Sequence, residues 1–192
     1  MEILNRGERR HRVLPVTFLL ILLLALPARF AGQEQDEYAV KAAFLFNFTR
    51  FVEWPQANGS SPFGICILGD DPFEAIIDKL TQGKTAVGRT IQVRRIKSAA
   101  DAKSCQIAFV STAERSKAAM LVDAVRGTPV LTVGETQEFL HMGGMIALPM
   151  EAHHVNIVIS TTVAQSANLK ISAKLLTLAK IYKSDRNIAR TP

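Results

Sequence analysis

Two cysteines, Cys66 and Cys105, are the residues of this 192-residue chain whose chemistry is most readily specified. Each lies in or beside a short apolar run typical of a buried strand, residues 63–68 and 106–110. In an exported domain, two cysteines most simply form one disulfide that staples the fold. The alternatives are a reversible redox switch and a pair of unpaired core thiols. A disulfide can form only if the two strands are neighbours in the sheet, which the sequence alone does not establish.

Two adjacent carboxylates, Asp70 and Asp71, follow the first apolar run, at the end of a strand where α/β sheets commonly bind ligands. Such a pair could hold a hard cation such as Mg²⁺. We favour a simpler interpretation, in which Asp71 caps a helix that begins with Pro72 and Asp70 is solvated. No third acidic ligand has an obvious position, so we expect no metal site here.

Histidines cluster in sequence at His153 and His154, with His141 nearby, and imidazoles are common ligands of Zn²⁺. Neighbouring residues of an extended segment point in opposite directions, which makes two adjacent ligands awkward. We therefore expect a solvated turn at this position.

Motifs of the common enzyme classes are missing from the sequence. It contains no G-x-S-x-G, no Walker loop, no G-x-G-x-x-G after a strand and no H-E-x-x-H. We expect no catalytic residues and no cofactor, with an uncharacterised hydrolase as a remote alternative.

The stretch from Glu34 to Pro55 is the element around which the rest must be organised. Phe44, Phe48, Phe51 and Val52 recur at the spacing of one helix face, whereas Leu45 and Phe46 fall off it. The acidic residues at its start suit the positive end of the helix dipole. This pattern predicts the main core helix, although an exposed aromatic surface for a partner is an alternative.

Strand and helix patterns alternate along the remainder of the chain. Apolar runs at residues 63–68, 106–110 and 128–134 predict buried strands, and a more polar strand at 87–96 is expected near a sheet edge. Ser111, with Glu114 three residues on, has the spacing of a capping box. Residues 143–150 and 155–160 predict a hairpin with a four-residue turn, and 171–182 predict a helix. The fold expected is α/β, a single-domain sandwich with a mixed central sheet flanked by helices.

The first 31 residues have the features of a secretory signal peptide, with four arginines before an apolar run and small residues after it. An uncleaved anchor is the alternative, because neither Ala28 nor Ala31 gives an ideal cleavage motif. The boundaries predicted are 1–31 for the signal peptide, 34–185 for the domain and 186–192 for a C-terminal tail. Residues 1–31 hold 5 of the 23 basic and 2 of the 17 acidic residues, so the remainder has a net charge of +3. We expect an exported protein that binds no nucleic acid.

Several segments, taken in order, resemble the YfiR family of periplasmic regulators. They read EYAVKAAFLFNFTRFVEWP, GICILGDDPF, GGMIALPMEAHHVNIVIS and LKISAKLLTLAKIY, and they span about Glu37 to Tyr182. The resemblance implies an α/β sandwich that acts by binding other proteins. It implies a membrane-bound diguanylate cyclase of the YfiN type as the partner held inactive, an outer-membrane lipoprotein of the YfiB type as a second partner, and homodimers. Inhibiting the cyclase would lower cyclic di-GMP and biofilm formation. A periplasmic small-ligand-binding or sensory subunit is the alternative.

The resemblance carries over to individual residues unevenly. Cys66 and Cys105 match one cysteine pair of redox-responsive relatives, but this chain has no second pair toward its C-terminal half. Where relatives often read F-E-I-N, this chain has Val158 in place of the charged residue. The partner surface is expected along the hairpin and the last helix, around Met145, Ile146 and Val158, with sheet core as the alternative for each residue.

A charge at Ile146 tests this expectation. If Ile146 lies on the partner surface, replacing it by a charged residue should release the partner while the chain stays folded, as measured by co-purification and circular dichroism. A variant that unfolds would favour the core.

Overall fold

The computed structural model describes residues 28–55 and 61–183, with side chains from Asp36 onward within those ranges. The chain divides into a short unit, Met1–Glu34, and a domain, Gln35–Pro192. The predicted signal peptide lies largely, and the predicted tail wholly, outside the described residues. Within the described ranges, no helix combines the length and the apolar character needed to cross a membrane.

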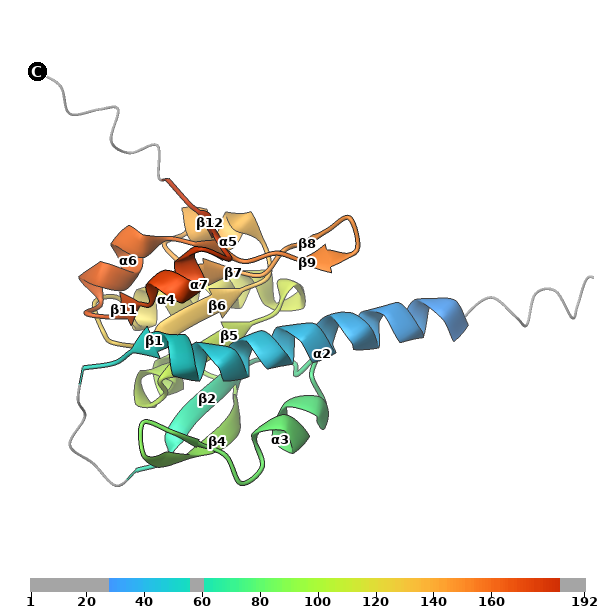
Figure 1. Ribbon diagram of the computed structural model, residues 1–192, viewed down its shortest axis with the longest axis horizontal. Coiled ribbons are helices and arrows are strands. Elements are labelled where there is room, and N and C mark those ends of the chain that lie inside the picture. The colour runs from blue at the N-terminus through green and yellow to red at the C-terminus, as the bar shows by residue number, and fades with distance from the viewer. Residues whose placement is uncertain (1–27, 56–60, 184–192) are drawn as a thin grey trace, which may run out of the picture. The chain divides into compact units, whose positions relative to one another are not determined.

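A mixed sheet of eight strands, in the order β12-β10-β7-β6-β5-β2-β4-β3, forms the centre of the domain (Figure 1). The strands from β4 through β2, β5 and β6 to β7 are parallel, whereas β3 and β10 run antiparallel to their neighbours β4 and β7. The predicted α/β architecture with a mixed sheet is therefore confirmed. In chain order the strands are β1 (Val52–Glu53), β2 (Phe63–Leu68), β3 (Thr85–Ala86), β4 (Arg89–Ile96), β5 (Ile107–Val110), β6 (Leu131–Gly134), β7 (Ile146–Ala147), β8 (Met150–Glu151), β9 (His154–Val155), β10 (Val158–Ile159), β11 (Lys170–Ile171) and β12 (Lys180–Ile181).

Helices cover both faces of this sheet. In chain order they are α2 (Ala28–Phe51), α3 (Ile76–Thr81), the 3₁₀ helices η1 (Ala99–Ser104) and η2 (Thr112–Glu114), α4 (Arg115–Ala124), α5 (Gln137–His141), α6 (Thr161–Ser166) and α7 (Ala173–Leu176). One core cluster joins the sheet to α2, α3, α6 and α7, and a second joins its other face to η1, α4 and α5.

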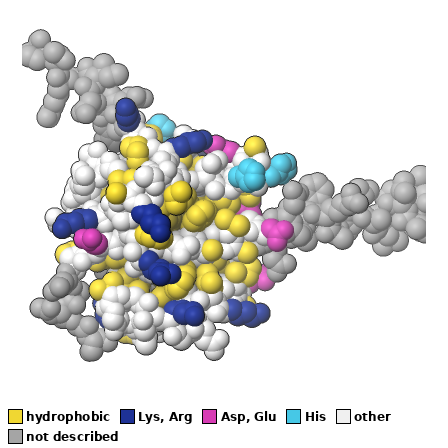
Figure 2. Space-filling view, in the orientation of Figure 1, with side chains coloured by type: hydrophobic (Ala, Val, Ile, Leu, Met, Phe, Trp, Pro, Cys, Tyr) yellow, Lys and Arg dark blue, Asp and Glu magenta, His cyan; other side chains and the backbone are white. Residues whose placement is uncertain are grey.

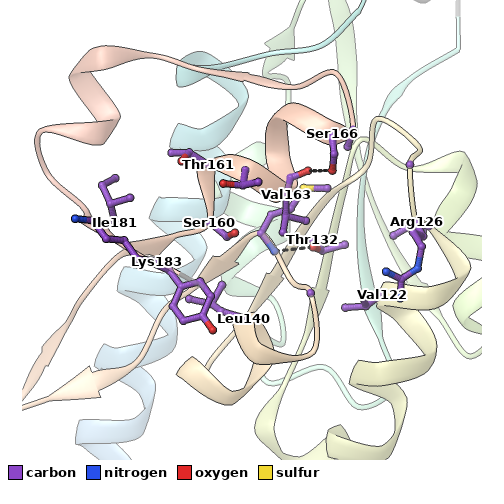
Figure 3. Close-up of a pocket in the computed structure, with 17 residues that line it drawn as sticks. Val122, Arg126, Thr132, Leu140, Ser160, Thr161, Val163, Ser166, Ile181 and Lys183 are labelled. Atoms are coloured by element: carbon purple, nitrogen blue, oxygen red, sulfur yellow. Dashed lines mark hydrogen bonds between the residues drawn. The ribbon is translucent and has the colours of Figure 1, made fainter. Parts of the chain in front are cut away.

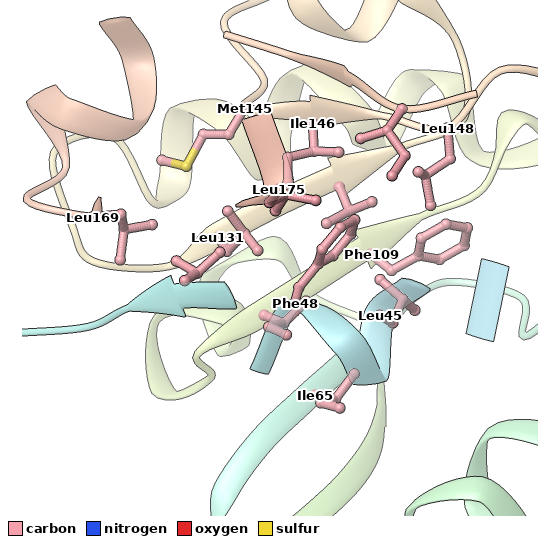
Figure 4. Close-up of a cluster of buried hydrophobic side chains, with 14 of the residues drawn as sticks. Leu45, Phe48, Ile65, Phe109, Leu131, Met145, Ile146, Leu148, Leu169 and Leu175 are labelled. Carbon is pink, nitrogen blue, oxygen red and sulfur yellow. The ribbon is translucent and has the colours of Figure 1, made fainter. Parts of the chain in front are cut away.

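The alternation of side chains along β2 explains why there are two clusters. All six residues of β2 are buried, with Ile65 and Ile67 in the cluster under α2 and with Cys66 and Leu68 in the cluster under α4. Successive side chains of a strand point to opposite faces, so a strand covered on both sides must be apolar throughout. Figure 4 shows Ile65 and Phe109 from the sheet packed with Leu45 and Phe48 of α2.

The buried face of α2 differs from the predicted one. Phe48 and Val52 are buried as expected, but Leu45 is fully buried while Phe44 and Phe51 are only partly covered. The helix also begins at Ala28, so the acidic residues expected at its first turn lie within it. The spacing of the apolar residues in α2 is compatible with burial of either of two adjacent faces of the helix. Contact with the sheet buries the face centred on Leu45.

The hairpin is confirmed, with a tighter turn than expected. β7 pairs with β10 and, farther out, β8 pairs with β9. Only Ala152 and His153 separate β8 from β9, and both have positive φ angles, 48° and 65°. Such angles match the right-handed twist of a two-residue hairpin loop.

The predicted helix over residues 171–182 is wrong. Only Ala173–Leu176 is helical, capped by the hydroxyl of Ser172, which accepts a hydrogen bond from the backbone N–H of Leu175. The chain then becomes β12, since the backbone N–H groups of Lys180 and Tyr182 donate to the carbonyls of Ile157 and Ile159. Covering the edge of β10 thus outweighs the local helical pattern.

The predicted capping box at Ser111 is also wrong. The Ser111 side chain makes no cap hydrogen bond. The Glu114 carboxylate instead accepts from the backbone N–H of Asp70 at 3.1 Å and from Lys117 at 2.8 Å. The Lys117 hydrogen bond, followed by that from Asp70, lowers the pKa of Glu114.

The predicted disulfide is confirmed: Cys66 in β2 is bonded to Cys105, just before β5, with their Cα atoms 6.1 Å apart. The pairing is feasible because β2 and β5 are neighbours in the sheet. Both residues are buried, in the cluster beneath α4.

Replacing both cysteines by alanine should lower the free energy of unfolding by about 4 kcal/mol, since the bond closes a loop with a sequence separation of 39. Urea unfolding of the oxidised protein and of the double variant measures this difference. The reduced native protein should behave like the double variant. A loss below about 1 kcal/mol would show that the bond is not a major staple.

Candidate functional site

A buried ionic cluster lies where β5 and β6 end, the side of a parallel sheet that most often carries function. Thr112 follows β5, Glu135 directly follows β6, and Lys41 reaches them from the middle of α2. The side chains of Lys41 and Glu135 are only 2% and 4% exposed. Lysine and glutamate are rarely buried to this degree unless they are paired.

Every charged group of this cluster has a partner. The Lys41 ammonium contacts Glu135 Oε1 and the Glu37 carboxylate, four residues earlier on the helix. It also lies 4.8 Å from the centre of the Tyr38 ring. The backbone N–H and the hydroxyl of Thr112 donate to Glu135 Oε2, at 2.5 and 2.8 Å. Fully satisfied in this way, the cluster fixes α2 against the ends of two strands.

A small cavity of about 150 Å³ adjoins this cluster, lined in part by Ser111, Thr112, Glu135 and Phe139. Both oxygens of Glu135 are already engaged, one by an ammonium and one by two donors. A carboxylate held in this way suits positioning better than proton transfer.

Lys41 was not among the residues predicted for a functional site. The spacing indicates that it faces the core, because Lys41 stands three and four residues before the apolar residues Phe44 and Leu45 on the helix. A lysine there is readily taken for a solvated residue, since lysine stems often lie along apolar surface with the charge in water. Its carboxylate partner is 94 residues away, which no local pattern reveals.

The predicted partner residues of the hairpin are buried. Met145, Ile146 and Val158 are 4%, 0% and 4% exposed. Figure 4 shows Met145 and Ile146 among the core side chains. Val158 lies on the opposite face of the sheet, beside Leu140 and Ala147. The prediction of an exposed patch at these residues is therefore corrected, and a charge at Ile146 should unfold the domain.

The carboxylates after β2 have structural partners. Asp71 accepts a hydrogen bond from the backbone N–H of Phe73 at 2.8 Å and pairs with Arg95, which also holds Asp78. The hydrogen bond from Arg95 lowers the pKa of Asp78, and that same bond raises the pKa of Arg95. This network of Asp71, Asp78 and Arg95 joins α3 to β4. Asp70 lies outside the network and is exposed, as expected.

The histidines also lie where the sequence suggested. His153 and His154 are exposed at the β8–β9 turn, and His141 Nδ1 is 3.0 Å from the Tyr182 hydroxyl. Across the described ranges, no three metal-binding side chains come together as a metal site.

An apolar face extends across α2 and the segment around α7, and we call it the α2–α7 face. It comprises Val40, Phe44, Phe51, Ile171 and Leu176. Val40 is 43% exposed, and the helical spacing of residues 40, 44 and 51 places them on one flank of α2. Figure 2 shows hydrophobic side chains gathered over this region, with Lys and Arg side chains among and around them.

Two contacts join the two parts of this face. Val52 pairs with Ile171 between β1 and β11, which brings the segment leading into α7 beside the end of α2. The Lys174 ammonium lies 5.6 Å from the centre of the Phe51 ring. An apolar centre with a polar rim is a common layout for a protein-binding surface.

Comparison with known proteins identifies the family. A model of the YfiR/HmsC-like family matches residues 38–180, which include Lys41, Thr112 and Glu135 of the ionic cluster and all five residues of the α2–α7 face. This chain belongs to the YfiR/HmsC-like family. Membership indicates a periplasmic regulator in cyclic di-GMP signalling, since proteins of this family are regulators rather than enzymes.

Two other comparisons add no functional argument. No curated protein matches the chain. A solved structure described as the ABC domain in complex with L-Trp, from Streptococcus pneumonia, shares 12% identity with it at a TM-score of 0.46. That match covers 62% of this chain and 55% of the other.

Removing the buried lysine tests its structural role. Lys41→Met should lower the free energy of unfolding by about 3 to 5 kcal/mol, because Glu135 would keep a buried charge without its cation. The double variant Lys41→Met/Glu135→Gln, whose neutral amide oxygen can still accept from Thr112, should recover most of that loss. Urea unfolding measures both changes.

Lys79→Met is the control, since Lys79 is an exposed lysine, also on a helix. It should change stability by no more than about 0.5 kcal/mol. A double variant as unstable as Lys41→Met alone would show that packing, and not charge pairing, explains the loss.

Proposed function

We propose that this protein is a periplasmic regulator that binds the periplasmic domain of a membrane-bound diguanylate cyclase and holds the enzyme inactive. Lower cyclic di-GMP and reduced biofilm formation would follow. The family match over residues 38–180 is the observation that carries the proposal. Export through the N-terminal segment 1–31 is part of it.

The α2–α7 face is the surface we assign to the cyclase. Burying its partly exposed apolar side chains would supply the driving force of association. Nearby cations, among them Lys174 and the exposed Arg50, would favour a partner with an acidic rim. This assignment replaces the hairpin residues, which are buried in the domain.

Inhibition of this kind needs only selective binding. A regulator that binds the inactive state of the enzyme about 100-fold more tightly than the active state shifts their ratio by the same factor, about 2.7 kcal/mol. A rigid binding surface loses less conformational entropy on association. The ionic cluster around Lys41 supports the proposal because it holds α2 in place on the sheet.

An outer-membrane lipoprotein and a second copy of the chain are further proposed partners. A lipoprotein that occupied the same face would compete with the cyclase and relieve inhibition. Self-association through that face would have the same effect, since a surface buried in a homodimer is not available to another protein.

Val40→Asp tests the proposed surface. Because Val40 is partly exposed, the variant should fold normally, yet a charge within the apolar interface should weaken binding at least about fivefold. The exported protein, tagged and used to capture partners from solubilised membranes, should retain a membrane protein with a GGDEF domain, and the variant should retain less. Cellular cyclic di-GMP should rise in the variant.

Val87→Asp is the matched control. Val87 is 63% exposed, beside β3 and β4 at the edge of the sheet. It should bind as the native protein does. Equal capture by both variants would exclude the α2–α7 face, whereas failure of the native protein to retain any GGDEF protein would count against the proposed partner.

A further inference from the structure

A second and larger cavity, of about 740 Å³, lies between α4, α6 and the end of β12 (Figure 3). It is distinct from the ionic cluster, and none of the residues of the α2–α7 face lines it. Its volume falls within the range of small-molecule sites, roughly 300–1,000 Å³.

Two residues that line this cavity, Ser160 and Thr132, have hydroxyl groups that can still donate a hydrogen bond. Ser160 is 3% exposed, and its hydroxyl has no hydrogen-bond partner among the described residues. Within the same ranges, no fully enclosed side-chain nitrogen or oxygen lacks a partner, so the Ser160 oxygen must reach the cavity. Thr132 Oγ1 accepts from the backbone N–H of Met145 at 3.1 Å, and its own proton has no acceptor in the described chain.

Apolar side chains form much of the remaining wall, including Val122, Val125, Leu140 and Val163. Arg126 and Lys183 are the charged residues that line the cavity in the described chain, and both are basic. The site therefore combines an apolar wall, two hydroxyl donors and a positive charge at its edge.

We infer that this cavity binds a small organic carboxylate with an apolar body. The hydroxyls of Ser160 and Thr132 would donate to the carboxylate, and Lys183 would favour its charge, together with Arg126, which also pairs with Asp123. Because the Ser160 oxygen is open to the cavity, a ligand acceptor would take the place of solvent at this hydroxyl. The inference does not depend on the identity of the partner protein, because it concerns a separate site.

An NMR titration of the exported domain with 4-phenylbutyrate tests the inference. Saturable shifts should appear at the amides of Thr132, Ser160 and Ile181. The neutral analogue 4-phenylbutanol should bind more weakly. Equal binding of the two compounds would overturn the carboxylate assignment, and shifts confined to the α2–α7 face would overturn the site.

Two variants and one control locate the site independently. Ser160→Ala should weaken 4-phenylbutyrate about 2- to 10-fold through loss of one hydrogen bond. Thr162→Trp places a large ring at an exposed lining position and should abolish binding, with folding checked by thermal unfolding. Ser111→Ala, a buried serine at the other cavity, is the matched control and should bind normally. Binding unaffected by both Ser160→Ala and Thr162→Trp would refute the proposed site.

Discussion

The contact between Lys41 and Glu135 decides where the longest helix of the domain lies. Taking two charges out of water is expensive, and the cost is recovered only where the geometry satisfies both ions. Here Thr112 and Glu37 supply the additional contacts, so the pair is fully satisfied. Apolar packing alone would hold α2 on the sheet but would fix its position less closely, because apolar contacts have little directionality. The ion pair fixes the position of the helix along and around its axis.

The same fixed position determines which side chains of α2 reach the surface. Leu45 and Phe48 enter the core, and Val40, Phe44 and Phe51 are left on one flank of the helix. The exposed apolar face is therefore a consequence of how the buried face is seated. A regulator that works by contact benefits from this arrangement, since its binding surface belongs to the main core helix and not to a loop.

The proposed regulator and the proposed ligand site occupy different parts of one sheet. The α2–α7 face lies over one side of it, and the larger cavity lies at an end of the strands near α4 and α6. β10 leads directly into α6, and β12 leads directly to the cavity, while both belong to the sheet on which α2 packs. A ligand in the cavity would thus contact elements continuous with the core beneath the protein-binding face.

The sequence by itself determined the class of fold and most of the buried strands. Continuous apolar runs of strand length, such as residues 63–68, indicate a strand that is covered on both faces of the sheet. The disulfide could also be predicted from the sequence, because two cysteines in an exported domain most simply bond to each other. The resemblance carried by the helix around Phe44 and Trp54 pointed to the family, which the match over residues 38–180 established.

Only the tertiary structure decided what depends on distant partners. The segment 171–182 has a local helical pattern, yet hydrogen bonds to the edge of β10 convert its end into a strand. Met145, Ile146 and Val158 could be surface or core until the sheet placed them inside. Lys41 acquires its role from a carboxylate 94 residues away. Local sequence encodes periodicity and turn chemistry, whereas burial and charge pairing depend on which segments the folded chain brings together.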